Sequence, residues 1–256
     1  MCLLVFALRT HPRLPLIVAG NRDEFHARPA QAARWWPDKP DIVGGRDLQA
    51  GGTWLAVHRS GRFAAVTNHR DAHRESAVLR SRGHLITGFL DHGGDVMRYI
   101  ESIDGDAYGG FNLLVADGRS AGYLSNRGGG LRELQPGVYG LSNATLDEPW
   151  TKVTRTRSRL ADLIEKDDVN ESSLMRLLGD REKASVDEVE MNGLSFSMAH
   201  ALTAPFIVHP EYGTRCSTVM TIDDAGRVRF LERRFQPDGR QSGESRYAFE
   251  SGQDPQ

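Results

Sequence analysis

The sequence of 256 residues has few cysteines and no long apolar run. Its two cysteines, Cys2 and Cys216, are too few for the disulfide framework of a small secreted domain. No apolar stretch approaches the ~20 residues that a membrane-spanning helix needs. The formal net charge is −2 and the pI is near 6.5, so the basic surface typical of nucleic-acid-binding proteins is missing. We therefore expect a chain that neither spans a membrane nor binds nucleic acid.

Motifs for metals and phosphates are also missing. No HExxH, CxxC or CxxCH occurs, and there is no GxGxxG or Walker-type loop. His69 and His73, with Asp71 between them, have a ligand-like spacing only if the segment is helical, and its polar composition favours a loop. We predict no metal site and no resident cofactor, and haem stays open only as a non-covalently carried ligand.

The N-terminus does not resemble a signal peptide. No basic stretch precedes the first apolar run, and Arg9, His11 and Arg13 interrupt that run before any small-residue cleavage site. We therefore predict a cytoplasmic protein. The sequence does not indicate its oligomeric state.

Strand-like and helix-like segments alternate in blocks. Apolar segments bounded by turn residues predict strands within residues 2–10, 15–24, 41–68, 111–126, 131–143, 206–223 and 227–235. Helical spacing appears in residues 81–103, interrupted near Gly93, and in residues 148–167 and 172–180. This order favours an α+β fold of two antiparallel sheets packed face to face, with helices outside. We predict one domain over residues 1–235 and a polar C-terminal tail, residues 236–256, that frays.

Cys2 directly follows the initiator methionine and begins a strand-like run. One interpretation is a buried cysteine that acts as a small hydrophobic residue. The other begins with removal of Met1, which a small second residue permits. Cys2 would then carry an α-amine that titrates near ~7.7–8.0 beside a thiol that titrates near ~8.5, so one residue would supply both nucleophile and base.

The second strand-like segment ends in Asn21, Arg22, Asp23 and Glu24 without a spacer. These residues form either a charged turn with weak ion pairs in solvent or one wall of a cleft. If the first two strands pair as a hairpin, Asp23 approaches the Cys2 end. Its carboxylate would then hold the α-ammonium or orient the nucleophile.

Three more polar residues lie at predicted strand ends. Asn68 and Asn143 are either ordinary turn residues or amides that donate hydrogen bonds to an oxyanion. Arg215 is either a surface arginine or a cation for a substrate carboxylate or for the thiolate. Cys216 beside it is expected on the opposite face of the strand, in the core.

The stretches MC, NRDEFHARP, GGRDLQAGGTWLAV, VTNHRD, GLSNATLDEPWTKV and YGTRCSTV, in this order, resemble the NRDE family of transport and Golgi organisation proteins. The resemblance covers nearly the whole chain. It implies the N-terminal nucleophile (Ntn) hydrolase fold, an αββα four-layer sandwich. Members of this family have been linked to haem trafficking and to lipid or acyl-CoA handling.

A more distant resemblance is to choloylglycine hydrolases and penicillin V acylases, which cleave linear amides with an N-terminal cysteine. It implies that Cys2 is the nucleophile, that Asp23 is the early aspartate, and that Asn68 and Asn143 are the two asparagines. Arg215 matches their late arginine. In one departure from their pattern, Gly20 stands where those enzymes carry a basic residue before the asparagine.

Two functions of different classes follow. The first is a cysteine Ntn hydrolase that acts on a linear amide or a related acyl bond after Met1 is removed. Its predicted catalytic residues are Cys2, Asp23, Asn68, Asn143 and Arg215, and Asn21, Arg22 and Glu24 are predicted to bind substrate. The second is a non-catalytic protein that binds and traffics haem, acyl-CoA or a lipid. A scaffold without a ligand would leave the polar strand ends unexplained.

Overall fold

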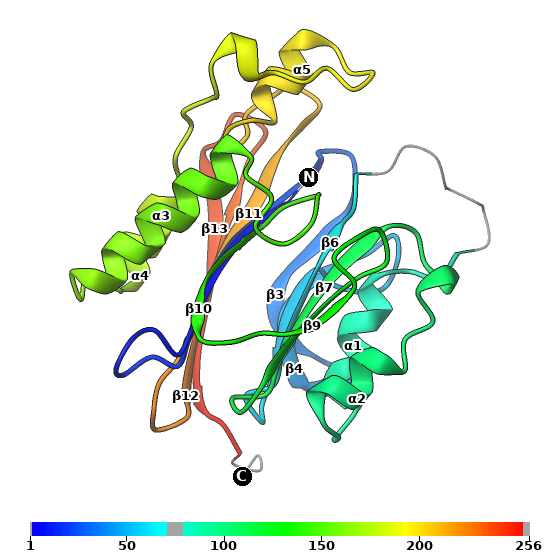
Figure 1. Ribbon diagram of the computed structural model, residues 1–256, viewed down its shortest axis with the longest axis vertical. Coiled ribbons are helices and arrows are strands. Elements are labelled where there is room, and N and C mark those ends of the chain that lie inside the picture. Colours follow the sequence, from blue (N-terminus) through cyan, green and yellow to red (C-terminus); the bar gives the residue numbers. More distant parts are fainter. Residues whose placement is uncertain (1, 71–78, 253–256) are drawn as a thin grey trace.

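The computed structural model describes residues 2–70 and 79–252, which form two antiparallel sheets packed face to face (Figure 1). The six-stranded sheet has the order β10-β1-β2-β11-β12-β13, and the seven-stranded sheet runs from β3 to β9 in sequence order. The first sheet contains β1 (Cys2–Leu8), β2 (Leu16–Phe25), β10 (Gly137–Leu141), β11 (Tyr212–Ile222), β12 (Arg227–Phe235) and β13 (Gln241–Glu250). The second contains β3 (Ala30–Trp36), β4 (Lys39–Asp47), β5 (Leu55–His58), β6 (Phe63–Asn68), β7 (Phe111–Ala116), β8 (Ala121–Ser125) and β9 (Leu131–Glu133).

Helices cover the outer face of each sheet. Strand alternation sends Phe6 and Val18 into the core between the sheets, and sends Val5 and Ile17 toward the helices on the other side. The six-stranded sheet is covered by α3 (Thr151–Glu165) and α4 (Glu171–Leu178), and the seven-stranded sheet by α1 (Gly83–Asp91) and α2 (Val96–Glu101). The predicted αββα sandwich is therefore confirmed.

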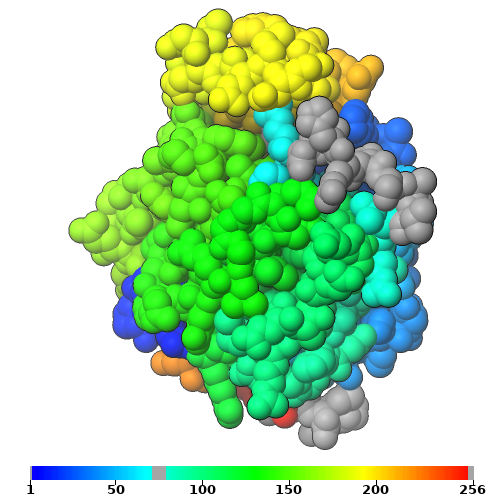
Figure 2. All heavy atoms as spheres, turned by 45° about the vertical axis from the view of Figure 1, so that its right-hand side comes forward, coloured from blue at the N-terminus to red at the C-terminus, as the bar shows by residue number. Residues whose placement is uncertain are grey.

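The remaining helical turns lie in the connections. They are α5 (Phe196–Ala201) and the 3₁₀ turns η1 (Gly105–Ala107) and η2 (Val186–Glu188). Figure 2 shows the segment around α5, in yellow, as a lobe at one end of the molecule. His73 and Asp71, which have a ligand-like spacing in the sequence, lie outside the described residues.

Two strands were not expected. β3 was not predicted because its sequence, AQAARWW, carries little strand patterning. β13 lies in the segment that was expected to fray, and that expectation is wrong for residues 241–250, which pair with β12 along their length. The pairing is stabilised by Tyr247 and Phe249, whose rings pack against Trp35 of the other sheet.

Candidate active site

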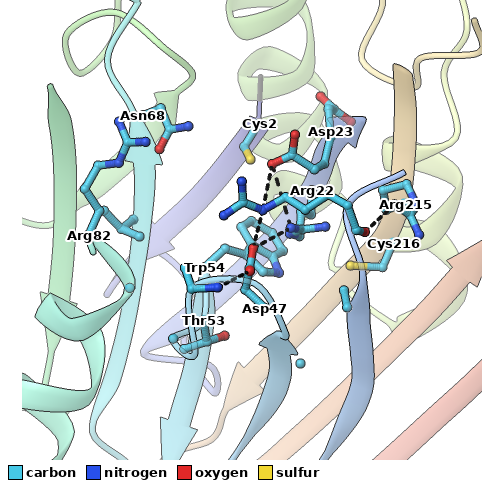
Figure 3. A pocket seen from close by; sticks show the side chains of 18 of the residues that line it. Cys2, Arg22, Asp23, Asp47, Thr53, Trp54, Asn68, Arg82, Arg215 and Cys216 are labelled. Carbon is cyan, nitrogen blue, oxygen red and sulfur yellow. Dashed lines mark hydrogen bonds and ion pairs between the residues drawn. The ribbon is translucent and has the colours of Figure 1, made fainter. Parts of the chain in front are cut away.

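At one end of the six-stranded sheet, the termini of several of its strands line a cavity of about 940 Å³. β1 begins at Cys2, which pairs with Arg22 of β2, and Arg22 pairs on its other side with Cys216 of β11. The register places these three side chains on the inner face of the sheet. Figure 3 shows them on one side of the cavity, with Asn68 and Arg82 facing them from the other side.

Asn143 and Ser142 hold the backbone of Cys2. The Cys2 nitrogen donates a hydrogen bond to Asn143 Oδ1 at 2.9 Å, and Ser142 Oγ donates to the Cys2 carbonyl oxygen at 2.7 Å. Asn143 Nδ2 in turn donates to the carbonyl oxygen of Asn68 at 2.5 Å. Removal of Met1 would turn the same Cys2 nitrogen into an α-amine, so Asn143 is placed to hold that amine.

A buried polar network fixes the segment that carries these two residues. Thr67 Oγ1 donates to the Ser142 carbonyl oxygen at 2.6 Å and accepts a hydrogen bond from Asn112 Nδ2. The Tyr123 hydroxyl donates to Asn112 Oδ1 at 2.8 Å. All of these side chains are buried, and a satisfied buried network specifies one arrangement strongly. The seven-stranded sheet thereby positions Asn143 against the strand that begins at Cys2.

Arg22 provides the cation next to Cys2. It is 8% exposed, and its guanidinium lies 3.2 Å from Asp47 Oδ2 and 3.8 Å from Glu24 Oε2. At Gly20, an added Cβ would lie 2.8 Å from Leu4 Cδ1 and 3.1 Å from Trp54. There is therefore no space for a side chain at position 20. The cation that faces Cys2 is Arg22, two residues further along β2.

Asp23 lies beside Cys2 but points to the other face of the sheet. It is 3% exposed, and Thr214 Oγ1 donates to its Oδ1 at 2.7 Å. Burial raises the pKa of Asp23 to about 6, against the charge of Lys152, the hydrogen bond from Thr214 and the charge of Arg22. Asp23 is therefore mostly ionised at neutral pH and changes charge in mildly acidic solution.

The two cysteines cannot form a disulfide. Each pairs with Arg22, from opposite sides, so their Cα atoms are about 9–11 Å apart, beyond the ~7 Å limit for a bridge. Burial raises the pKa of the Cys2 thiol and the charge of Asp23 adds to this effect, while the Asp23 backbone and the charge of Arg22 act in the opposite direction. Burial also raises the pKa of Cys216 well above its ordinary value, and the charge of Glu232 adds to this effect.

A β-bulge directs Arg215 toward the cavity. Thr214 pairs with Asp23 and Cys216 pairs with Arg22, so Arg215 is the extra residue between them. Arg215 Nη1 donates to the carbonyl oxygens of Phe25, His26 and Arg28, at 2.9–3.1 Å. Because of the bulge, both Arg215 and Cys216 line the cavity, although neighbours in a regular strand would face opposite ways.

The structure brings most of the predicted residues together, and one lies apart. Cys2, Arg22, Asp23, Glu24, Asn68, Asn143 and Arg215 all line the cavity. Asn21 does not, because it faces the helix layer. There its Nδ2 donates to the carbonyl oxygens of Leu178 and Pro205, and its Oδ1 accepts from Ser217. Asn21 therefore anchors the end of α4 to the sheet.

Several residues that support the site from the surrounding structure were not predicted from the sequence. Thr67, Asn112, Tyr123 and Lys152 do not follow from local patterns, since each acts through partners far away in sequence. Trp54 lines the cavity and is visible in the sequence only as part of the GGTWLAV stretch. Among residues 2–70 and 79–252, no three His, Cys, Asp or Glu side chains are placed to hold a metal ion.

Comparison with known proteins agrees with this architecture. The model of the family described as Transport and Golgi organisation 2 matches residues 1–237. The chain belongs to this family. It is 35% identical to the human Transport and Golgi organization protein 2 homolog over 91% of this chain and 92% of the human one. It is 28% identical to the Drosophila melanogaster protein of that name, over 91% of each chain.

A solved structure extends the likeness to a wider fold. The C2A mutant of conjugated bile acid hydrolase from Clostridium perfringens aligns with a TM-score of 0.57, covering 100% of this chain and 94% of that one. The sequence identity is 8%, so this likeness concerns the fold alone, which is that of the Ntn hydrolases. None of the helices in the described part of this family member is both long and apolar enough to cross a membrane.

Proposed function

We propose that this protein is a cysteine N-terminal nucleophile hydrolase that cleaves a linear amide or a related acyl bond after Met1 is removed. The observation that carries the proposal is the hydrogen bond between the Cys2 nitrogen and Asn143 Oδ1, made at the edge of a large cavity. This bond would orient the α-amine next to its own thiol.

The reaction would use the α-amine as its base. The amine takes the thiol proton, and Cys2 Sγ forms a bond to the substrate carbonyl carbon, giving a tetrahedral oxyanion. The resulting ammonium group protonates the leaving amine or thiol as its bond to carbon breaks, which leaves an acyl thioester on Cys2. Water then attacks the thioester, the amine accepts the water proton, and the acid product leaves with regeneration of the thiol.

In this mechanism, two asparagines would stabilise the oxyanion. Asn68 faces Cys2 across the cavity (Figure 3). Asn143 Nδ2 uses one N–H for the carbonyl oxygen of Asn68 and has a second. Amide donors fixed before the reaction stabilise the developing charge without reorganising. Arg22 adds a positive charge on the same face of the sheet as Cys2.

The first test is the intact mass of the protein purified from the cell that makes it, followed by turnover of a panel of amides and thioesters. We expect Met1 to be absent, and Cys2→Ala and Cys2→Ser to abolish turnover while ligand still binds. Cys216→Ser serves as the matched control and should keep full turnover. Retention of Met1 on essentially every molecule would contradict the proposal, because the α-amine would not exist.

The second candidate function is binding without turnover, and the charge of the cavity favours it. Arg80, Arg82, Arg215 and Arg234 line the same cavity as Cys2, which suits an anionic ligand such as an acyl-CoA or haem. In that case Cys2→Ala should bind acyl-CoA, or produce a Soret band with haem, as well as the unchanged protein does. No acyl adduct would then form on Cys2.

A further inference from the structure

Lys152 is a buried lysine next to the candidate site. It is the second residue of α3 and is 2% exposed, although lysine normally keeps its ammonium group in water. Within the described residues, its Nζ has no hydrogen-bond partner. A buried cation is costly unless an opposite charge lies close to it. None of the catalytic roles proposed above uses this residue.

Strand alternation indicates which opposite charge that is. Asn21 and Asp23 share the face of β2 that α3 and α4 cover, whereas Arg22 and Cys2 lie on the inner face. The carboxyl group of Asp23 and the ammonium group of Lys152 therefore occupy the same buried layer, directly behind Cys2. α3 contacts both β1 and β10, which holds Lys152 over the beginning of the site.

The charges around Lys152 agree with this placement. Burial lowers the pKa of Lys152, Asp23 and Cys2 act to raise it, and Arg70 acts to lower it. For Asp23, Lys152 comes first among the groups that oppose the effect of burial. Each of the two groups therefore stabilises the ionised form of the other.

We propose that Lys152 is a positioning residue that keeps Asp23 ionised behind Cys2, so that the carboxylate orients the α-amine that removal of Met1 creates. The role in orienting the amine rests on the proposed hydrolase function. The ionisation of Asp23 does not, because it can be measured whether or not Met1 is removed. The two ideas therefore fail separately, one by intact mass and the other by titration.

The test is a carboxyl ¹³C titration of the full-length protein labelled at its aspartate side chains. The Asp23 signal is assigned by its loss in Asp23→Asn, and its midpoint should lie near pH 6. In Lys152→Met the midpoint should rise by at least about 1 unit, because the nearby positive charge is removed. Lys152→Arg should restore the original midpoint. Lys166→Met, at the exposed end of α3, should leave it unchanged.

Two results would overturn the proposal. The first is an unchanged Asp23 midpoint in a folded Lys152→Met protein. The second applies if Lys152→Met does not fold: the double variant Lys152→Met/Asp23→Asn, which removes both charges, should then fold again. If the double variant also stays unfolded, Asp23 is not the partner of Lys152 and the proposal fails.

Discussion

Cys2 and Cys216 lie at nearly equivalent places and differ in what surrounds them. Both pair with Arg22 and both line the same cavity. Cys216 lies within β11, is 7% exposed, and is affected by the charge of the buried carboxylate of Glu232. Cys2 begins its strand, is only partly buried, and has its backbone nitrogen held by Asn143.

The comparison shows what distinguishes the proposed nucleophile, Cys2, from a second thiol in the same cavity. Burial raises the pKa of both thiols, so neither is activated by its surroundings alone. What Cys2 has and Cys216 lacks is a backbone nitrogen that becomes a base when Met1 leaves. The position of Cys2 in the chain, rather than the chemistry of its side chain, therefore determines its proposed role.

The largest expected effect comes from blocking that nitrogen. A leucine inserted between Met1 and Cys2 should keep Met1 attached, since a bulky second residue prevents its removal. Turnover should fall by at least about 10⁴-fold, because loss of a member of a nucleophile–base unit has effects of this size. Intact mass measures whether Met1 is retained, and an activity assay measures turnover. As a control, iodoacetamide should still alkylate Cys2. Full turnover with Met1 attached would show that another base acts.

A smaller loss is expected from Asn143→Ala, which frees the Cys2 nitrogen and removes an amide donor. Turnover should decrease by about 10²–10³-fold, as for other losses of an oxyanion donor. The control is Asn170→Ala, which removes the N-cap of α4. That change should lower the free energy of unfolding by about 1 kcal/mol without affecting turnover. Equal effects of both variants on turnover would assign Asn143 a purely structural role.

Asp23→Asn should reveal a pH-dependent stability in the acidic range, below the pH at which Cys2 and Cys216 titrate. Burial raises the pKa of Asp23 to about 6, so the folded state binds this proton more tightly than the unfolded state. The stabilisation is therefore present below about pH 4 and is lost as the pH rises through about 6. The free energy of unfolding of the unchanged protein, measured relative to that of Asp23→Asn, should fall by up to about 3 kcal/mol over this range.

Urea denaturation of the unchanged protein and of Asp23→Asn at pH 4, 5, 6 and 7 measures this difference. The difference should decline across the series and level off above pH 7. A difference that stays constant with pH would mean that Asp23 titrates with an ordinary pKa. A difference that increases with pH would mean that its partners, Thr214, Lys152 and Arg22, outweigh burial.

The contrast between the two cysteines could be only partly predicted from the sequence. The continuous apolar runs of β1 and β2, separated by a short turn, predict a hairpin, and the hairpin brings Cys2 to the Asn21–Glu24 segment. The sequence predicts Cys216 in the core, and Cys216 is buried there. The bulge at Arg215, through which both residues line the cavity, has no signal in YGTRCSTV. Register shifts depend on the partner strand, and no local pattern records them.

The burial of Lys152 and the pairing of β13 both depend on residues far away in the sequence, so local patterns did not predict them. The amphipathic pattern of α3 assigns lysine to the solvent side, because lysine is rarely buried. Only the fold reveals the buried carboxylate that accompanies it. β13 has a polar sequence, but Tyr247 and Phe249 alternate, and that short alternation was the signal for an edge strand.

The smallest expected effect is a difference in thiol reactivity between the two cysteines. Cys2 is the more exposed thiol, and burial raises the pKa of Cys216 well above its ordinary value, an effect to which the carboxylate of Glu232 adds. At pH 8, iodoacetamide should therefore label Cys2 at least roughly tenfold faster than Cys216, as a difference of one pKa unit would give. Peptide mass mapping over time measures both rates in one sample. Glu232→Gln should narrow the ratio by raising the Cys216 rate alone. A faster reaction at Cys216 would reverse the comparison, because the cavity would then activate the thiol that has no amine beside it.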